Sequence, residues 1–276
     1  MNILKFLESL ADESVLKTKG SRRDSLEQFK AFGAKTAMAA VPFGLAAAAL
    51  APQKASAAAA QAAETPTQAL QLALTLEYLE DEFYRLALLA PGLIPSSDRP
   101  IFQQIADHEF DHVQFLKTAL GSNAPAKPMF DFTVGGAFPT FTDYPTFLAL
   151  AQAFEDTGVR AYKGQAGNLI SEPQLLEYAL QIHSVEARHA AEVRRLRNRL
   201  GLADQKGWIT GNDRGGLPVQ AQAVYDGEQN ITQAGFNTAG VQLRDGAAGA
   251  GAASESFDEP LTGAQATAIA SLFIVS

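Results

Sequence analysis

The sequence predicts an all-α protein: an antiparallel four-helix bundle with one long crossover, followed by an irregular, glycine-rich C-terminal extension and a short terminal helix. Four long segments repeat apolar residues at helical spacing, and few of their residues favour strands. The first and second segments, and the third and fourth, are joined by short links, whereas about 21 residues separate the second from the third. Glycine then becomes frequent, because residues 201–260 hold 11 of the 22 glycines.

Helix boundaries follow from capping residues and helix breakers. Pro91 and Gly92 end the first helix, and Ser97 is expected to cap the second. Ser171, with Gln174 three residues later, has the pattern of a capping box at the start of the fourth. The four bundle helices and the terminal helix are therefore expected at 67–90, 97–120, 142–169, 171–201 and 262–275.

The long connection fits a bundle of two hairpins. A helix of 24 residues is ~36 Å long, whereas an extended linker of 21 residues reaches ~70 Å. The crossover is therefore long enough to run along the whole bundle, and the short links make the helices of each hairpin antiparallel neighbours.

Residues 1–57 have the pattern of an export signal. Arg22 and Arg23 precede a weakly apolar stretch at 31–51, and residues 55–57 (Ala-Ser-Ala) form a small-x-small cleavage pattern. Such signals are of the twin-arginine kind, so we expect export to the periplasm or the extracellular space, without stable membrane insertion after cleavage. The alternative is an N-terminal membrane anchor, although the apolar run is short and rich in alanine. The expected organisation is a signal at 1–57, a bundle at 58–200 and an extension at 201–276 that packs on the bundle.

Composition excludes several classes of function. The chain has no cysteine, which removes disulfide scaffolds, thiolate zinc sites, cysteine-ligated iron–sulfur clusters and thiol nucleophiles. Its net charge is −8, and residues 58–276 alone hold 14 basic and 25 acidic residues, which disfavours binding to nucleic acid. Any metal site must be built from carboxylates and the four histidines.

The residues that carry chemistry form an internal repeat. The pattern Glu-x6-Tyr on one helix, then Glu-x-x-His on the next, occurs twice. The second glutamate follows the first by 32 positions in the first copy and by 31 positions in the second. Its members are Glu77, Tyr84, Glu109 and His112 in the first hairpin and Glu155, Tyr162, Glu186 and His189 in the second. Two such hairpins pack with approximate two-fold symmetry, so we expect the two sets of side chains to converge.

These glutamates lie on apolar helix faces. Glu109 shares a stripe with Ile105 and Val113, and Glu155 shares one with Leu148. Four ionised carboxylates in an apolar interior are costly unless they are paired. Two divalent cations would neutralise them while both histidines stay neutral. One glutamate from each of two helices, plus Glu-x-x-His from each of the other two, is the ligand pattern of dinuclear carboxylate centres in bundles.

These motifs resemble the ferritin-like superfamily of di-iron carboxylate proteins over about residues 66–200. A narrower resemblance extends to the C-terminus and is to the exported ferritin-like-domain family that includes the desiccation-related proteins of plants. It rests on LEYLEDEFY at 76–84, FEDTGV at 154–159, VEARH at 185–189 and FDEPL at 257–261.

The resemblance implies metal ligands at Glu77, Glu109, His112, Glu155, Glu186 and His189, with Glu109 and Glu186 as bridges. It implies two iron ions, or manganese or a mixed pair, that react with O2 or peroxide. The expected function is Fe(II) oxidation or binding, in a ferroxidase-like oxidoreductase for stress protection. The alternatives are a non-catalytic, desiccation-related envelope protein that keeps the bundle as a scaffold, and metal sequestration without turnover.

Several nearby residues are expected to support the ligands or to compete with them. Glu80 lies near the same face as Glu77, but the matched interval to tyrosine favours Glu77. Tyr84 and Tyr162 lie two turns, ~10.5 Å, from the glutamates of their own helices. We therefore expect each either to hydrogen bond a ligand on a neighbouring helix or to be a core tyrosine with its hydroxyl at the edge of the bundle. His108 and His183 lie near the same faces, and each is expected either to support the ligands in the same way or to be a structural residue of the interior.

Residues 108–112 also spell His-Glu-x-x-His, the zinc-protease motif, in which both histidines hold one zinc ion. The second copy of the repeat has Val185 where the first histidine, His108, stands in the first copy. The repeat therefore favours the dinuclear interpretation.

Overall fold

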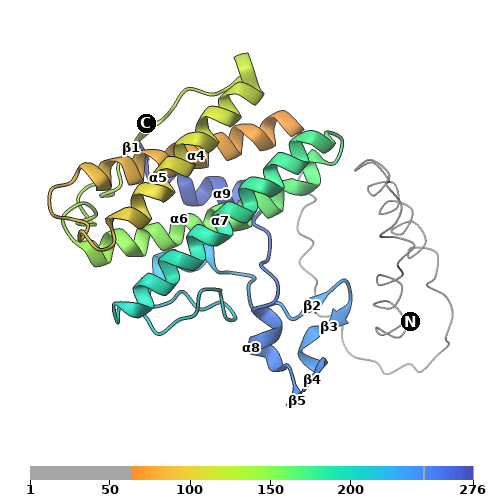
Figure 1. Ribbon diagram of the computed structural model, residues 1–276. Coiled ribbons are helices and arrows are strands. Elements are labelled where there is room, and N and C mark those ends of the chain that lie inside the picture. The colour runs from red at the N-terminus through yellow and green to blue at the C-terminus, as the bar shows by residue number, and fades with distance from the viewer. Residues whose placement is uncertain (1–63, 245, 276) are drawn as a thin grey trace, which may run out of the picture. The chain divides into compact units, whose positions relative to one another are not determined.

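The computed structural model describes residues 64–244 and 246–275, so the predicted signal lies outside the described residues. Four long helices, α4 (Pro66–Leu89), α5 (Arg99–Leu120), α6 (Tyr144–Gln165) and α7 (Pro173–Arg199), pack as two hairpins, α4 with α5 and α6 with α7 (Figure 1). The crossover contains the short 3-10 helix η1 (Gly121–Asn123) and the strand β1 (Met129–Phe130). The predicted bundle with one long crossover is confirmed. None of the described helices has the length and apolar character needed to cross a membrane.

Two of the predicted helix starts are wrong in detail. The cap position of α5 is Asp98 rather than Ser97, and that of α7 is Glu172 rather than Ser171; neither side chain forms a capping hydrogen bond. A proline in the first turn sets each start, because its fixed φ suits the helix and its missing N–H needs no partner there. Capping boxes instead open α4 at Thr65 and α9 (Gly263–Ala270) at Thr262. Helix α6 ends at Gln165 and continues as the 3-10 helix η2 (Ala166–Leu169).

The apolar core is divided into two clusters along the bundle. One is rich in aromatic rings, among them Phe83, Phe102 and Phe147, whose centroids lie 4.9–5.0 Å apart between neighbours. The other includes Leu74 and Leu116. On α5 and α7, the glutamate and histidine of the carboxylate repeat fall in the sequence between the residues of the two clusters. The fold therefore places a polar layer between two apolar ones.

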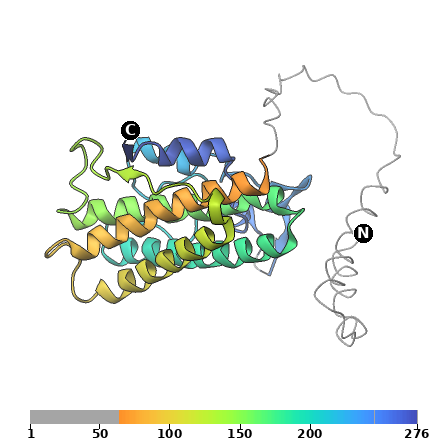
Figure 2. The ribbon, with the colours of Figure 1, turned by 90° about the horizontal axis from the view of Figure 1, so that it is seen from above.

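The extension is built from short elements. They are η3 (Val219–Val224), β2 (Thr232–Gln233), β3 (Phe236–Asn237), η4 (Thr238–Gly240), β4 (Gln242–Leu243), β5 (Gly246–Ala247), α8 (Gly249–Ser254), α9 and β6 (Ile274–Val275). Helix α9 packs against α4 and α6 (Figure 2). It is shorter than predicted, because the chain ends in β6, which pairs antiparallel with β1 of the crossover.

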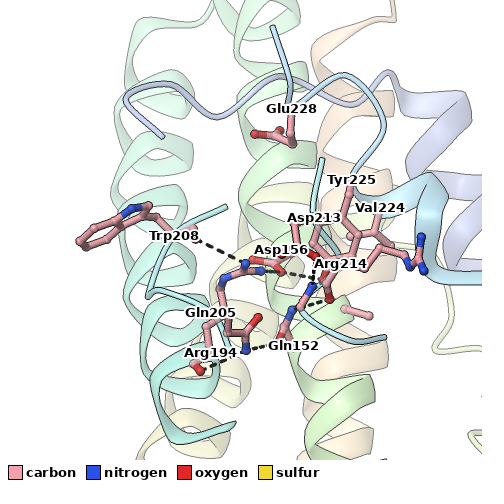
Figure 3. Close-up of polar contacts among 12 residues, drawn as sticks. Gln152, Asp156, Arg194, Gln205, Trp208, Asp213, Arg214, Val224, Tyr225 and Glu228 are labelled. Carbon is pink, nitrogen blue, oxygen red and sulfur yellow. Dashed lines mark hydrogen bonds and ion pairs between the residues drawn. The ribbon is translucent and has the colours of Figure 1, made fainter. Parts of the chain in front are cut away.

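Buried polar contacts hold the extension against α6 and α7 (Figure 3). Asp156 of α6 accepts hydrogen bonds from Arg194 of α7 at 2.6 Å and from the Tyr225 hydroxyl of the extension at 2.8 Å. Arg160 of α6 forms an ion pair with Glu228 at 2.6 Å. These side chains are almost fully buried, so each charge needs its partner.

A glycine lets the extension approach α6 closely. The Leu261 amide donates to the Arg160 carbonyl at 3.0 Å, next to Gly164. A Cβ atom on Gly164 would lie 1.8 Å from the Leu261 carbonyl oxygen, whereas a Cβ atom on Gly167 would meet nothing within 4 Å. The contact therefore requires glycine at 164 but not at 167.

Gly164→Ala should destabilise the protein, because the methyl group would push the segment around Leu261 away from α6. Overpacking of this kind costs ~1–3 kcal/mol, which thermal or urea unfolding measures. Gly167→Ala is the matched control and should change the free energy of unfolding by less than about 0.5 kcal/mol. Equal stabilities of the two variants would contradict the contact.

Candidate metal centre

The six predicted ligands come together in the polar layer of the bundle. Glu77 lies on α4, Glu109 and His112 on α5, Glu155 on α6, and Glu186 and His189 on α7. All four glutamates are 0% exposed, and the two histidines are also buried. The cluster thus draws on every helix of the bundle.

The ligand atoms form two overlapping groups. The first contains Glu77, Glu109, His112 and Glu186, and the second contains Glu109, Glu155, Glu186 and His189. Within each group, one ligand atom from every residue lies within 4.8 Å of the others. Glu109 and Glu186 belong to both groups, as carboxylates that bridge two neighbouring ions would.

Both histidines turn the same ring atom toward the carboxylates. His112 Nδ1 lies 3.2 Å from Glu77 Oε2, 3.1 Å from Glu109 Oε2 and 3.2 Å from Glu186 Oε1. His189 Nδ1 lies 2.8 Å from Glu109 Oε1 and 3.3 Å from Glu155 Oε2. His112 therefore faces the glutamate of its own helix and carboxylates of α4 and α7, whereas the two carboxylates in contact with His189 Nδ1 come from α5 and α6.

Burial and neighbouring charges shift the pKa values of these groups. Burial raises the pKa of Glu109 to about 7, although hydrogen bonds from His112 and His189 act to lower it. Burial, followed by the negative charge of Glu109, raises the pKa of Glu186 well above its usual value. Burial opposes the charged form of His189, but the negative charge of Glu155 and the hydrogen bonds that the histidine donates to Glu109 and Glu155 raise its pKa to about 11. Without a metal ion, protons therefore balance part of the buried negative charge.

The donor atoms of the centre fit divalent cations. Within the described residues, five of them lack a hydrogen bond of good geometry, although histidine Nδ1 atoms lie 2.8–3.3 Å from three of the oxygens: Glu109 Oε1, Glu155 Oε2, both carboxylate oxygens of Glu186, and His189 Nδ1. Buried polar atoms without a partner are costly and uncommon. Two cations between the groups would supply a partner for all of them, and a set of carboxylate oxygens with two imidazole nitrogens suits iron or manganese.

Two tyrosines link the hairpins. The Tyr84 hydroxyl donates to Glu155 Oε1, and the Tyr162 hydroxyl donates to Glu77 Oε1. Each tyrosine thus contacts a ligand of the other hairpin rather than the glutamate of its own helix. A hydrogen bond to a ligating carboxylate orients it, so the tyrosines hold these two side chains toward the centre.

The structure gives the supporting contact to His108 rather than to His183. His183 interacts with the backbone of Val159, and among the described residues its Nδ1 has no hydrogen-bond partner. His108 Nδ1 lies 2.8 Å from His189 Nε2, and the two rings are stacked at 14°. Such a contact fixes the tautomer and orientation of a ligating histidine.

The sequence places His108 near the ligand face, as a structural or supporting residue, but does not identify His189 as its partner, because His108 lies at the edge of its helix face. Only the packing of α5 against α7 brings it to His189. The arrangement also differs from the zinc-protease motif, because His108 is in neither group of ligand atoms.

Glu80 is a fifth buried carboxylate beside the centre. It is 3% exposed, but among the described residues only Glu77 of α4 belongs to a group of ligand atoms. Burial, followed by the charge of Glu186, raises the pKa of Glu80 well above its usual value. Gly158 of α6 leaves room for the side chains of Glu80 and Glu186, since a Cβ atom at this position would lie 3.0 Å from Glu186 Oε2 and 3.4 Å from Glu80 Oε1. The geometry favours Glu77 as the ligand from α4.

Comparison with known proteins agrees with this architecture. Residues 65–199 match the family model of the ferritin-like domain. A search of curated proteins finds no match. The match and the topology of α4–α7 together show that this segment is a ferritin-like domain, and its buried carboxylate and histidine cluster is compatible with a metal site. The narrower resemblance to desiccation-related proteins stays a prediction.

Glu77→Gln should weaken metal binding by roughly 10- to 100-fold, because it replaces an anionic ligand with a neutral amide. Glu80→Gln changes the same helix by the same chemistry one turn away and should keep the metal content of the unaltered protein. Metal analysis after purification without chelator and anaerobic Fe(II) titration measure both. Metal loss in Glu80→Gln with retention in Glu77→Gln would reverse the assignment.

Proposed function

We propose that this protein binds two iron ions in the bundle and oxidises Fe(II) with O2 or peroxide, as a ferroxidase-like oxidoreductase for stress protection. One observation carries the proposal: Glu109 and Glu186 belong to both groups of ligand atoms, so the buried layer offers two adjacent four-residue sites. The four glutamates bring a charge that two divalent ions neutralise. A manganese pair, or a mixed iron and manganese pair, fits the same donor set.

The six ligands would hold two irons, and such a pair would supply two electrons as each Fe(II) becomes Fe(III); together with two protons these would reduce one H2O2 to two molecules of water, or one O2 to H2O2. The protein's side chains do the rest. Anionic ligands stabilise the higher charge of the ferric state, because the Coulomb attraction grows with the charge of the ion. The surrounding apolar clusters keep bulk water from the centre.

Hydrogen bonds position the ligands for this chemistry. Tyr84 and Tyr162 each hold one oxygen of Glu155 and Glu77, so that the other oxygen of each carboxylate faces a histidine and would be available to a metal ion. His108 is only partly buried and connects His189 to the outer side of the bundle. It is therefore placed to pass a proton between the centre and solvent.

The double variant Glu109→Ala, Glu186→Ala should lose both metal ions, because it removes the two shared carboxylates. The unaltered protein should hold about two ions per chain and oxidise Fe(II) faster than buffer does, whereas the double variant should match buffer. Metal analysis, and absorbance of the ferric product after air is admitted to an anaerobic Fe(II) titration, measure these outcomes. Asp111→Ala with Glu192→Ala changes one exposed and one partly exposed acidic residue of the same two helices, neither of them a candidate ligand, and is the matched control.

Other results would support the alternative functions. Two bound ions without oxidation above buffer would indicate metal sequestration. Full protection of stressed cells by the double variant would indicate a scaffold. Less than half an ion per chain in the unaltered protein would contradict the metal centre itself.

We further propose that the protein acts outside the cytoplasm. The support is the sequence pattern of residues 1–57, which lies outside the described residues. The proposal concerns a soluble protein after cleavage, with metal ions and O2 or peroxide as its partners and without nucleic acid.

Replacing Arg22 and Arg23 with lysine should block export and leave the uncleaved chain in the cytoplasm, because lysine keeps the charge but lacks the guanidinium pair that the signal presents. Lys30→Arg, a conservative change in the same segment, is the control. Cell fractionation and N-terminal sequencing of the exported protein provide the readout, with Ala58 expected as the first residue. Export of the double lysine variant at the normal level would contradict a twin-arginine signal.

A further inference from the structure

A cavity separate from the candidate metal centre, called the second cavity below, lies between α6, the extension and residues 263–275, which form the terminal segment. Its volume is about 530 Å³, and none of the six candidate metal ligands lines it. Its wall is mostly apolar, with Leu150 and Phe154 from α6, Leu217 from the extension, and Ile269 and Phe273 from the terminal segment. Close-packed interiors do not leave space of this size, and apolar cavities of several hundred cubic ångströms are typical of small-molecule sites.

One cation, Arg197 of α7, is buried in this wall. It is 4% exposed, and both hydrogen bonds of its guanidinium leave from Nη1, to Gln152 Oε1 and to the Gly215 carbonyl at 3.0 Å. Its Nε has no hydrogen-bond partner within the described residues. The Nε edge of a guanidinium is one of the faces on which a planar carboxylate binds through two hydrogen bonds.

The charge of Arg197 is not balanced by the polar network beside it. Asp156, the buried carboxylate of that network, is already held by Arg194 at 2.6 Å and by the Tyr225 hydroxyl at 2.8 Å (Figure 3). Within the described residues, no carboxylate forms an ion pair with Arg197. Asp226, the acidic residue that lines the cavity, is exposed. A buried charge without a counter-ion is costly, and a bound anion would supply the missing partner.

We propose that this cavity binds a fatty acid, with the carboxylate paired with the guanidinium of Arg197 and the alkyl chain along the apolar wall. A monocarboxylate matches the single buried cation, whereas a phosphate dianion would need further positive groups that the described wall lacks. A long apolar body matches the remaining lining. The inference is independent of the metal centre.

The test is calorimetric titration of the full chain with dodecanoate below its micelle-forming concentration, beside dodecanol, which has the same chain without the charge. Dodecanoate should bind, and dodecanol should bind about tenfold to hundredfold more weakly, as expected for loss of a charge-assisted hydrogen bond. Arg197→Met should reduce dodecanoate affinity by a similar factor and leave dodecanol affinity unchanged. No binding of dodecanoate, or equal binding of the alcohol, would overturn the proposal.

A second pair of variants tests the apolar wall without touching Arg197. Ala268→Phe, on the face of α9 that lines the cavity, should fill it and reduce binding at least about tenfold. Ala264→Phe, at an exposed position of α9 that does not line it, should bind as the unaltered protein does. These variants and the alcohol comparison decide the question if Arg197→Met fails to fold, and equal affinities of the two α9 variants would place the ligand elsewhere and overturn the proposal.

Discussion

Negative charge buried inside a helical bundle has to be balanced, and much of this structure follows from that requirement. Four fully buried glutamates and Glu80 lie in one layer, with apolar clusters on either side that offer no counter-charge. Two histidines and two tyrosine hydroxyls meet part of the demand, yet within the described residues four carboxylate oxygens and one histidine nitrogen of the layer lack a hydrogen bond of good geometry. The remaining balance must come from bound cations or from protons, which is why a metal-binding interpretation explains the layer better than a structural one.

Balanced charge also positions the extension. Asp156 directly follows Glu155 on α6 but points into a different network, where Arg194 and Tyr225 bind it (Figure 3). Buried ion pairs contribute little net stability, since desolvation offsets their attraction. Their consequence here is specificity: the extension has one placement in which the buried charges of α6 and α7 find partners. Arg197 is the exception, and that exception distinguishes the second cavity from a packing defect.

The two hairpins are similar but not equivalent. Tyr84 and Tyr162 exchange hydrogen bonds between hairpins in a symmetric way. His108 supports His189. The corresponding position in the second copy of the repeat is Val185, which cannot support His112 in the same way. Glu80 likewise faces Gly158, so one side of the layer carries an additional carboxylate. The two sites of the centre therefore have different surroundings, and two ions bound there would differ in their chemistry.

The sequence by itself determined the fold class, the pairing of helices and the set of candidate ligands. The helical spacing of the apolar residues indicates which face of each helix is buried. The interval from Glu77 to Glu109 nearly equals the interval from Glu155 to Glu186, so the candidate ligands lie at the same level along both hairpins. Tertiary structure alone decided the His108 contact with His189, the pairing of β6 with β1, and the cavity beside Arg197. These features join segments far apart in the chain, and their geometry depends on how whole elements pack, which no local pattern of residues records.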